Sequence, residues 1–306
     1  MATSLLITGA TGKQGGSVIS ALLSSPAFSP TSTKIYALTR SPTSASSLRL
    51  ASKSPSISLI GGDLANVPAI FASLPSPPSG VFSVQLPGKG EVAQGKALVD
   101  EAVKAGVKKF VYASVERGGE KSKDNPTDIP HFKTKHEIEK YLELKTKESG
   151  GRMNYTILRP VFFLDNFEWG FLGKIIATAW KISLPPKKPL QVIATTDIGP
   201  FGAAAFLDPE DTTYKNKALS LAGDELTFEE ANEIFKEKTG KEIPTTYEFL
   251  ARMALWAFGE VGTMFRWFRT DGFGADTEKL RSLEAGRGLK KFGVWVEGSH
   301  FGKLSS

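Results

Sequence analysis

The chain alternates between short apolar runs and longer stretches in which apolar residues recur every three or four positions. This alternation repeats several times before residue 160. Such an order is typical of strands and covering helices in a parallel sheet. We therefore predict a doubly wound parallel α/β sheet. Its expected strands are Thr3–Thr8, Lys34–Thr39, Ile57–Ile60, Gly80–Val84, Lys108–Ala113 and Asn154–Arg159.

Residues 161–306 contain fewer strand-like runs and more helical ones. Thr227, followed three residues later by Glu230, has the pattern of a helix-starting capping box. We predict a sheet domain over residues 1–160 and a smaller, mostly helical α/β lobe over 161–306. A segment near 190–207 is expected to return to the sheet domain. The further elements are helices at Gly170–Ile182, at Asp197–Phe206 and from Thr227, and strands at Leu190–Ala194 and Ala218–Leu221.

A glycine-rich turn follows the first apolar run at once. It reads Gly9-Ala10-Thr11-Gly12-Lys13-Gln14-Gly15-Gly16, and a helical pattern starts at Ser17. Strand, glycine turn and helix form the arrangement that holds a dinucleotide pyrophosphate, because glycine lets phosphate oxygens approach backbone N–H groups. The spacing is GxxGxxG rather than the simplest GxGxxG, and a plain connection is the alternative interpretation.

Three further positions at strand ends are candidates for nucleotide contacts. Arg40 and Ser41 close the second strand, where a site for NAD would carry Asp or Glu. A guanidinium beside a hydroxyl suits a 2′-phosphate, so NADP is expected, with an ordinary surface arginine as the alternative. Asp63 follows the third strand and either meets the adenine or caps the next helix. Gln85 follows the fourth strand and is a candidate for the ribose or nicotinamide.

A helical stretch over residues 131–142 carries the second candidate site. His131 and Lys135 are four residues apart and share a helix face. Short-chain dehydrogenases place Tyr and Lys at this spacing, and here histidine stands at the tyrosine position. Histidine titrates near neutrality and could transfer a proton, whereas the plainer interpretation leaves only cofactor binding to Lys135. Ser114, at the end of the fifth strand, lies near the expected chemistry, and residues 116–130 are expected to form a mobile loop.

Two aromatic segments have open interpretations. Phe163 and Asn166 follow the sixth strand, where an aromatic segment could shield a nicotinamide ring or simply pack against the sheet. The stretch from Tyr247 to Phe268 is helical and rich in aromatic residues. It could form a lid over an apolar pocket, a surface for a partner, or the packed core of the lobe.

Composition narrows the function classes. The chain has no cysteine, which excludes disulfides and thiolate zinc sites, and we expect no bound metal. Its net charge is +6, but the lysines are spread out, so no direct nucleic-acid binding is expected. Lys174 and Lys181 interrupt the longest apolar stretch, and no signal peptide is evident, so no membrane association is expected. We expect a cytoplasmic location, with a nuclear one also open.

In combination these motifs resemble the NmrA-like family of atypical short-chain dehydrogenases/reductases. The resemblance rests on Ile7–Gly16, Leu38–Arg40, His131-Phe132 with Lys135, and Leu158–Asn166, with further features at Thr196–Gly199 and Ala222–Thr227. It implies a Rossmann domain that binds NADP(H) and a small C-terminal lobe. By position, Gly9 to Gln14 would hold the pyrophosphate, Arg40 the 2′-phosphate, and Asp63 with Leu64 the adenine region. Gln85, Lys135 and Asn166 would lie nearer the nicotinamide.

The same resemblance leaves two functions open. Some family members look like redox sensors that bind the dinucleotide and report it to a regulatory protein partner. Others are NADPH-dependent oxidoreductases, here expected to reduce a small apolar carbonyl, quinone or phenolic substrate. The missing tyrosine favours the redox sensor.

Overall fold

The computed structural model describes residues 3–168, 170–286 and 288–303. The chain forms two compact units, and segments of the two units alternate along the sequence. The first unit contains the residues up to Val115, then Thr134–Arg159 and Ile198–Leu219. The second contains Glu116–Lys133, Pro160–Asp197 and the residues from Ser220 onward. Residues 116–133 thus join the second unit, although the sequence-based division assigned them to the first.

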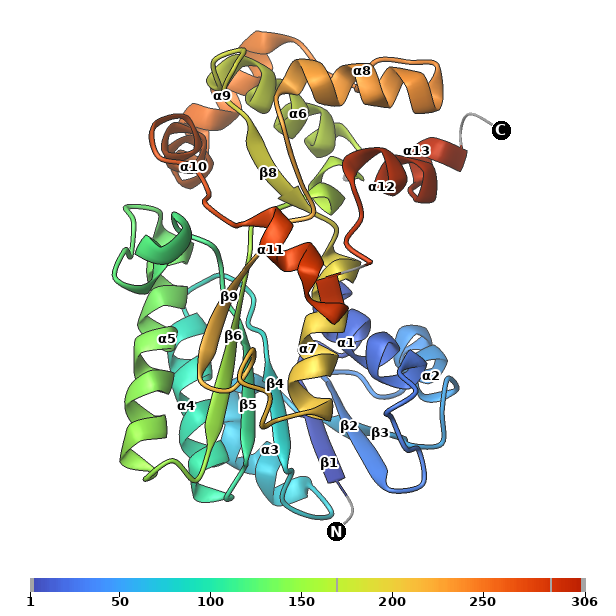
Figure 1. Cartoon of the computed structure of the whole chain (residues 1–306), viewed down its shortest axis with the longest axis vertical. Coiled ribbons are helices and arrows are strands. Elements are labelled where there is room, and N and C mark those ends of the chain that lie inside the picture. Colours follow the sequence, from blue (N-terminus) through green and yellow to red (C-terminus); the bar gives the residue numbers. More distant parts are fainter. Residues whose placement is uncertain (1–2, 169, 287, 304–306) are drawn as a thin grey trace. The chain divides into compact units, whose positions relative to one another are not determined.

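The first unit is built on a seven-stranded sheet in the order β3-β2-β1-β4-β5-β6-β9 (Figure 1). Each of the neighbouring pairs from β3 to β6 is parallel, which confirms the predicted doubly wound α/β class. The order reverses beside β1, which pairs with β2 on one side and β4 on the other. The strands are β1 (Thr3–Ile7), β2 (Thr33–Thr39), β3 (Ile57–Gly61), β4 (Gly80–Ser83), β5 (Lys109–Ala113), β6 (Asn154–Pro160) and β9 (Lys217–Leu221).

Helices cover both faces of this sheet because successive strand residues point to opposite sides. On one face Leu6, Val81 and Phe110 pack with α3, α4 and α5. On the other face α1 packs against α7 (Figure 1). The helices are α1 (Lys13–Ser24), α2 (Ala45–Ala51), α3 (Val67–Ser73), α4 (Glu91–Lys104), α5 (Pro130–Glu148) and α7 (Ile198–Leu207), with a 3₁₀ turn η1 at Leu64–Asn66.

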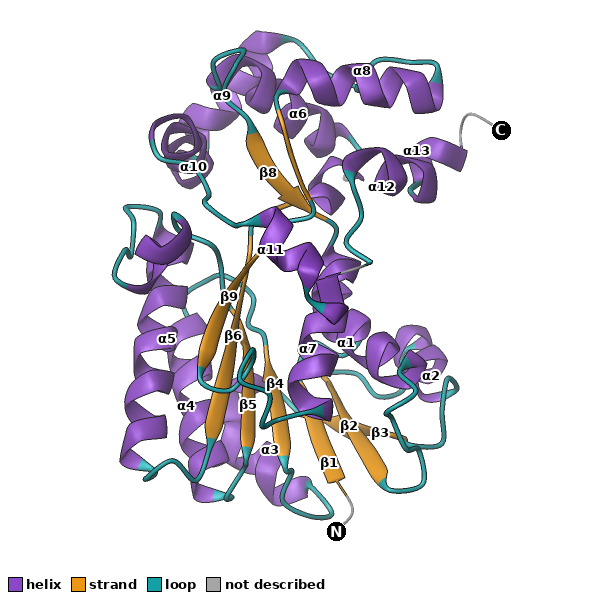
Figure 2. Ribbon diagram, in the orientation of Figure 1, coloured by secondary structure: helices purple, strands orange, loops and turns teal. Residues whose placement is uncertain are grey.

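The second unit is mostly helical (Figure 2). A three-stranded sheet in the order β10-β8-β7 is its only sheet among the described residues. The strands are β7 (Phe162–Phe163), β8 (Leu190–Ile193) and β10 (Asp224–Leu226). The helices are α6 (Phe171–Ser183), α8 (Phe228–Thr239), α9 (Glu248–Ala257), α10 (Gly259–Thr270), α11 (Thr277–Ser282), α12 (Phe292–Gly298) and α13 (His300–Lys303), with 3₁₀ turns η2 (Gly119–Lys123), η3 (Leu164–Glu168), η4 (Thr195–Asp197) and η5 (Glu284–Gly286). The capping box predicted at Thr227 and Glu230 is present at the start of α8.

The aromatic stretch from Tyr247 to Phe268 divides into two different helices. In α10 the rings of Phe265, Trp267 and Phe268 are buried and contact one another edge-on. In α9 and just beyond it, Trp256 is 84% exposed and Phe258 63% exposed. Only the second half of the stretch is therefore a packed core.

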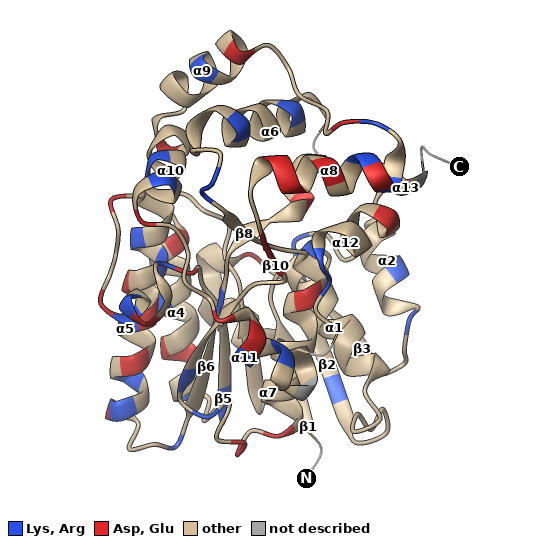
Figure 3. Cartoon of the chain, turned by 45° about the horizontal axis from the view of Figure 1, so that its top comes forward, with Lys and Arg blue, Asp and Glu red and all other residues tan. Residues whose placement is uncertain are grey.

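Charges are distributed in the way that the sequence suggested. Lysines and glutamates are interspersed along α5, whereas α8 carries glutamates in its first turn and lysines in its last (Figure 3). No helix in the described part of the chain is long and apolar enough to cross a membrane. The same residues contain no cluster of His, Asp and Glu side chains that could hold a metal ion.

Candidate functional site

The glycine turn after β1 has a backbone that requires two of its glycines. Gly9 has φ +58°, and a Cβ there would lie 2.7 Å from Cγ1 of Val84. A Cβ on Gly15 would lie 2.4 Å from the carbonyl oxygen of Gly9 and 2.5 Å from that of Thr8. Gly9 thus permits the turn, and Gly15 permits α1 to lie directly against it.

The start of α1 leaves backbone donors available. Gly12 precedes the helix and, within the described residues, gives its first amides no side-chain cap. The Gly12 amide itself donates to the Gly9 carbonyl at 2.9 Å, which closes the turn. Uncapped amides at a helix start carry a partial positive charge and favour an anion.

A groove of about 640 Å³ opens at the carboxyl ends of β1, β2, β3 and β4. This edge of the sheet includes the point where the strand order reverses, the usual ligand position in such folds. Seven of the predicted nucleotide residues line the groove. They are Gly9, Thr11, Gly12, Arg40, Ser41, Asp63 and Leu64.

Arg40 lies at the groove with an exposed guanidinium. Within the described residues this side chain has neither a hydrogen bond nor an ion pair. Ser41, Ser44 and Ser46 line the same groove, and the Ser44 hydroxyl also caps α2 by accepting from the Ser47 amide at 3.2 Å. A free guanidinium among hydroxyls is a ready receptor for a phosphate.

Ser44 and Ser46 did not emerge from the sequence as site residues. Their stretch reads only as serine-rich, and its composition does not distinguish groove from surface. The one available signal was the serine cap of α2, since a helix that starts directly after β2 must begin beside Arg40.

Asp63 and Gln85 have local partners. The Asp63 carboxylate caps η1 by accepting from the Ala65 amide at 2.8 Å, and Asp63 also lines the groove. Gln85 is buried and donates its side-chain amide to Oγ of Ser83 at 2.9 Å, while its Oε1 has no partner among the described residues. Gln85 lies beside the groove residues Val84 and Leu86 in sequence but does not line the groove itself.

The other glycine-turn candidates lie outside the groove lining. These are Ala10, Lys13, Gln14 and Gly15. Gln14 has a buried Oε1 that makes no hydrogen bond among the described residues. Phe163 and Asn166 belong to the second unit, in β7 and η3.

Lys135 is buried in the first unit and forms an ion pair. Its ammonium lies 2.8 Å from Oε1 of Glu91, which is itself 1% exposed. The second oxygen of Glu91 accepts from the Thr134 hydroxyl at 2.6 Å. Glu91 lines the groove, so the carboxylate stands between the lysine's helix and the groove wall. The lysine of the expected site is thus held by an acid 44 residues away in sequence.

His131 stands at the start of α5 and belongs to the second unit. Its Nδ1 lies 2.5 Å from Oε1 of Glu260, and its backbone amide donates to the same oxygen at 3.0 Å. The two contacts to one carboxylate oxygen fix the orientation of the imidazole ring.

Ser114 is tied into a buried network of the first unit. Its hydroxyl donates to the Glu139 carboxylate. Arg159 donates to the same carboxylate from Nε at 3.1 Å and from Nη2 at 2.7 Å. All three residues are buried. The network links β5, α5 and β6 and therefore gives Ser114 a structural role.

Residues 116–129 form the expected loop, with the 3₁₀ turn η2 inside it, and its first part is anchored. Glu116 and Arg117 are fully buried there. The Arg117 side chain donates to the carbonyls of Asn125 and Ser122, and Glu116 accepts from the Gly118 and Gly274 amides. Glycine, proline and polar residues indicated a loop, but the two charges organise it internally.

Comparisons with known proteins identify the family of the chain. The model of the NmrA-like family matches residues 1–288. The NmrA-like family domain-containing oxidoreductase ptmS of Penicillium ochrochloron is 26% identical over 258 residues, covering 77% of this chain and 73% of that protein.

Among solved structures, the NADPH-dependent quinone oxidoreductase QOR2 of Escherichia coli, complexed with NADPH, is similar at a TM-score of 0.70. It is 22% identical, with 96% of this chain and 99% of that chain covered. The negative transcriptional regulator NmrA, in complex with NAD, has a TM-score of 0.71 at 15% identity, with 100% and 96% covered. Because the family model spans both units and every groove residue, the chain belongs to the NmrA-like family.

Proposed function

We propose that this protein binds NADP(H) in the groove of the first unit. The observation that carries the proposal is Arg40, whose free guanidinium lines the groove together with three serine hydroxyls. A 2′-phosphate is the part of NADP that NAD lacks, and it is the group that such a cluster recognises. Similar structures crystallised with NADPH and with NAD support binding of a dinucleotide.

Calorimetric titration with NADPH and NADH tests this proposal. NADPH is expected to bind at least tenfold more tightly, and Arg40→Ala should remove most of that difference while leaving NADH affinity nearly unchanged. Arg49→Ala, at an exposed arginine in the last turn of α2, is the matched control and should retain the preference. Equal affinities of the wild-type protein for the two nucleotides would overturn the assignment.

We further propose that the protein reads the bound nucleotide as a redox sensor and reports it to a protein partner. Two observations favour a sensor of the bound nucleotide over an enzyme that reacts with it. No tyrosine stands four residues before Lys135, and the Lys135 ammonium is engaged by the buried Glu91. To donate a hydrogen bond or a proton to a substrate, the Lys135 ammonium must either leave Glu91 or bind both groups at once.

The second candidate function is an NADPH-dependent reductase of a small carbonyl, quinone or phenolic molecule. It is favoured by the His131–Glu260 pair, since an imidazole beside a carboxylate is a competent proton donor. Bound NADPH would supply the hydride, and His131, Lys135 or water would supply the proton. The oxidoreductase named among the relatives points the same way.

A panel of quinones, enals and ketones separates the two functions, with NADPH absorbance as the readout. For a sensor we expect tight NADPH binding and no turnover on any member of the panel. Turnover that falls at least tenfold in both Lys135→Met and His131→Phe would instead establish the reductase. Lys133→Met, at an exposed neighbour on α5, serves as the control in either case.

A further inference from the structure

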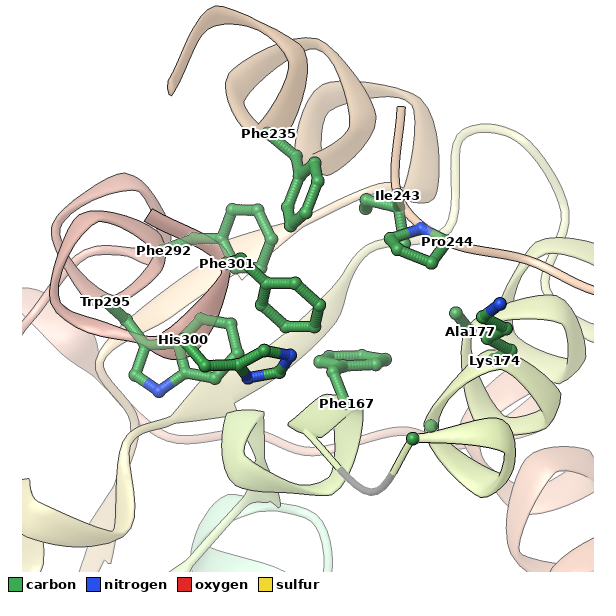
Figure 4. A pocket seen from close by; sticks show the side chains of 12 residues that line it. Phe167, Lys174, Ala177, Phe235, Ile243, Pro244, Phe292, Trp295, His300 and Phe301 are labelled. Carbon is green, nitrogen blue, oxygen red and sulfur yellow. The ribbon is translucent and has the colours of Figure 1, made fainter. Parts of the chain in front are cut away.

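The second unit contains a cavity that shares no lining residue with the nucleotide groove. It measures about 220 Å³ and lies between η3, α6, α8, α12 and α13 (Figure 4). Five aromatic side chains form most of its wall. They are Phe167, Phe235, Phe292, Trp295 and Phe301.

The aromatic wall is braced by ring contacts and does not depend on the cavity being filled. Phe301 contacts Phe235 edge-on, with ring centroids 5.2 Å apart, and Trp295 at 6.2 Å. Phe167 stacks on the buried Trp180 at 5.8 Å. Rings held from behind in this way keep their positions and present faces and edges to the cavity.

The opposite wall is formed by residues with little or no side chain. Gly170, just before α6, and Gly173 and Ala177 within it line the cavity, and Figure 4 labels Ala177. A Cβ on Gly173 would lie 2.2 Å from the backbone oxygen of Phe167, so glycine there lets η3 approach α6 closely. A larger side chain at Ala177 would occupy the space between α6 and the rings. The cavity therefore results from the contrast between a small-residue helix face and a ring of large aromatic residues.

Among the residues that the structure describes, two ionisable side chains line this cavity, Lys174 and His300. His300 Nδ1 is 3.3 Å from Oε1 of Glu168, so its imidazole already has an acidic neighbour. The Lys174 ammonium is the remaining charge, and within the described residues it has no hydrogen-bond or ion-pair partner. An unpaired cation at an apolar cavity favours an anionic group on whatever fills it and disfavours a cationic ligand.

We propose that this cavity is a second ligand site, which binds a planar aromatic carboxylate of one or two rings. The ring system would lie among the five aromatic side chains, and the carboxylate would pair with Lys174. The size agrees, because a cavity of about 150 Å³ lined by apolar residues accepts benzene. The remaining 70 Å³ or so leaves room for a second fused ring and a carboxylate toward the opening. The proposal is independent of the nucleotide function, since the lining residues of the two sites differ completely.

Titration of NADPH-saturated protein with 2-naphthoate tests the site, because the nucleotide then blocks the groove. We expect saturable one-to-one binding. The neutral analogue 2-naphthamide should bind at least fivefold more weakly, and Lys174→Met should abolish the difference between the two compounds. Lys187→Met removes an exposed lysine outside the cavity and should leave both affinities unchanged.

Ala177→Phe tests the cavity itself, because the new ring would fill the space beside α6. It should abolish naphthoate binding while NADPH affinity remains that of the wild type, which also shows that the variant is folded. Lys174 is exposed, so Lys174→Met keeps the test valid if Ala177→Phe does not fold. Absence of naphthoate binding to the wild type, or unchanged binding to a folded Ala177→Phe variant, would overturn the site. Equal affinities of wild type for naphthoate and naphthamide would overturn the carboxylate.

Discussion

Several ionisable side chains of the first unit are buried, and they differ in how well they are compensated. Glu139 has a bidentate arginine, and Lys135 has a carboxylate at 2.8 Å. Lys109, at the start of β5, is 3% exposed, and the one hydrogen bond of its ammonium within the described residues goes to the Tyr214 carbonyl at 3.4 Å. Burial therefore lowers the pKa of Lys109 to about 8, although the nearby Glu210 opposes the shift. An ammonium with so little compensation costs stability in the folded state.

Lys109→Met should stabilise the protein at pH 7. The folded pKa of about 8 lies below the unfolded value of 10.5, so the unfolded state binds more protons between these pH values. Stability of the wild type should therefore rise with pH across that window relative to the variant. We expect a gain on the order of 1–3 kcal/mol for Lys109→Met at pH 7, shrinking toward zero above the unfolded pKa. Urea denaturation at pH 7, 9 and 10.5 measures it, and a constant difference would contradict the assignment.

At the scale of elements, two adjacent helices of similar composition differ in the exposure of their aromatic side chains. Both α9 and α10 are amphipathic and rich in aromatic residues. In α10, Trp267 packs edge-on against Phe132 and Phe273. In α9, Trp256 points away from the described core and is exposed.

Alanine substitutions should distinguish the two helices clearly. Trp267→Ala is expected to lower the free energy of unfolding by about 3–5 kcal/mol, because it leaves a large cavity among packed rings. Trp256→Ala should change it by less than about 0.5 kcal/mol, as is usual for an exposed position. Urea denaturation of both variants provides the measurement. A large loss in Trp256→Ala would mean that α9 is covered in solution.

At the scale of the whole molecule, the interleaving of the two units affects how a ligand stabilises the chain. The groove and its candidate residues lie in the first unit, and the aromatic cavity lies in the second. A ligand that binds only the folded state raises stability in proportion to the logarithm of its concentration. The two ligands should thus act on different units.

NADPH at about 100 times its Kd should stabilise the first unit by about 2.7 kcal/mol. For a unit of this size we expect a Tm increase of about 5–10 °C in differential scanning calorimetry. Arg40→Ala at the same NADPH concentration should show a clearly smaller increase. If the two units unfold in separate transitions, the Tm of the second unit should not change. An increase in the Tm of the second unit alone would contradict binding in the groove.

Much of the fold could be predicted because it depends on short-range patterns. Each expected strand of the sheet is present, since apolar runs of that length between turn residues have few alternatives. The bend at Gly9 and the close approach at Gly15 also follow from local chemistry, as only glycine fits those backbones. The sequence by itself therefore determined the α/β class, the glycine turn and the position of Arg40 at the end of β2.

What the candidate site can do was decided by contacts between distant residues. Lys135 and Glu91 are 44 residues apart, and His131 and Glu260 are 129 apart. Neither pair has a signature in the spacing of residues, because a carboxylate on a remote helix is indistinguishable from any surface acid until the helices pack. The burial of Glu116 and the cavity beside Ala177 likewise result from the packing of segments that are distant in sequence. Local sequence determined the glycine turn and the position of Arg40, and only tertiary packing decided which charges are engaged, which aromatic helix is covered and where the aromatic cavity lies.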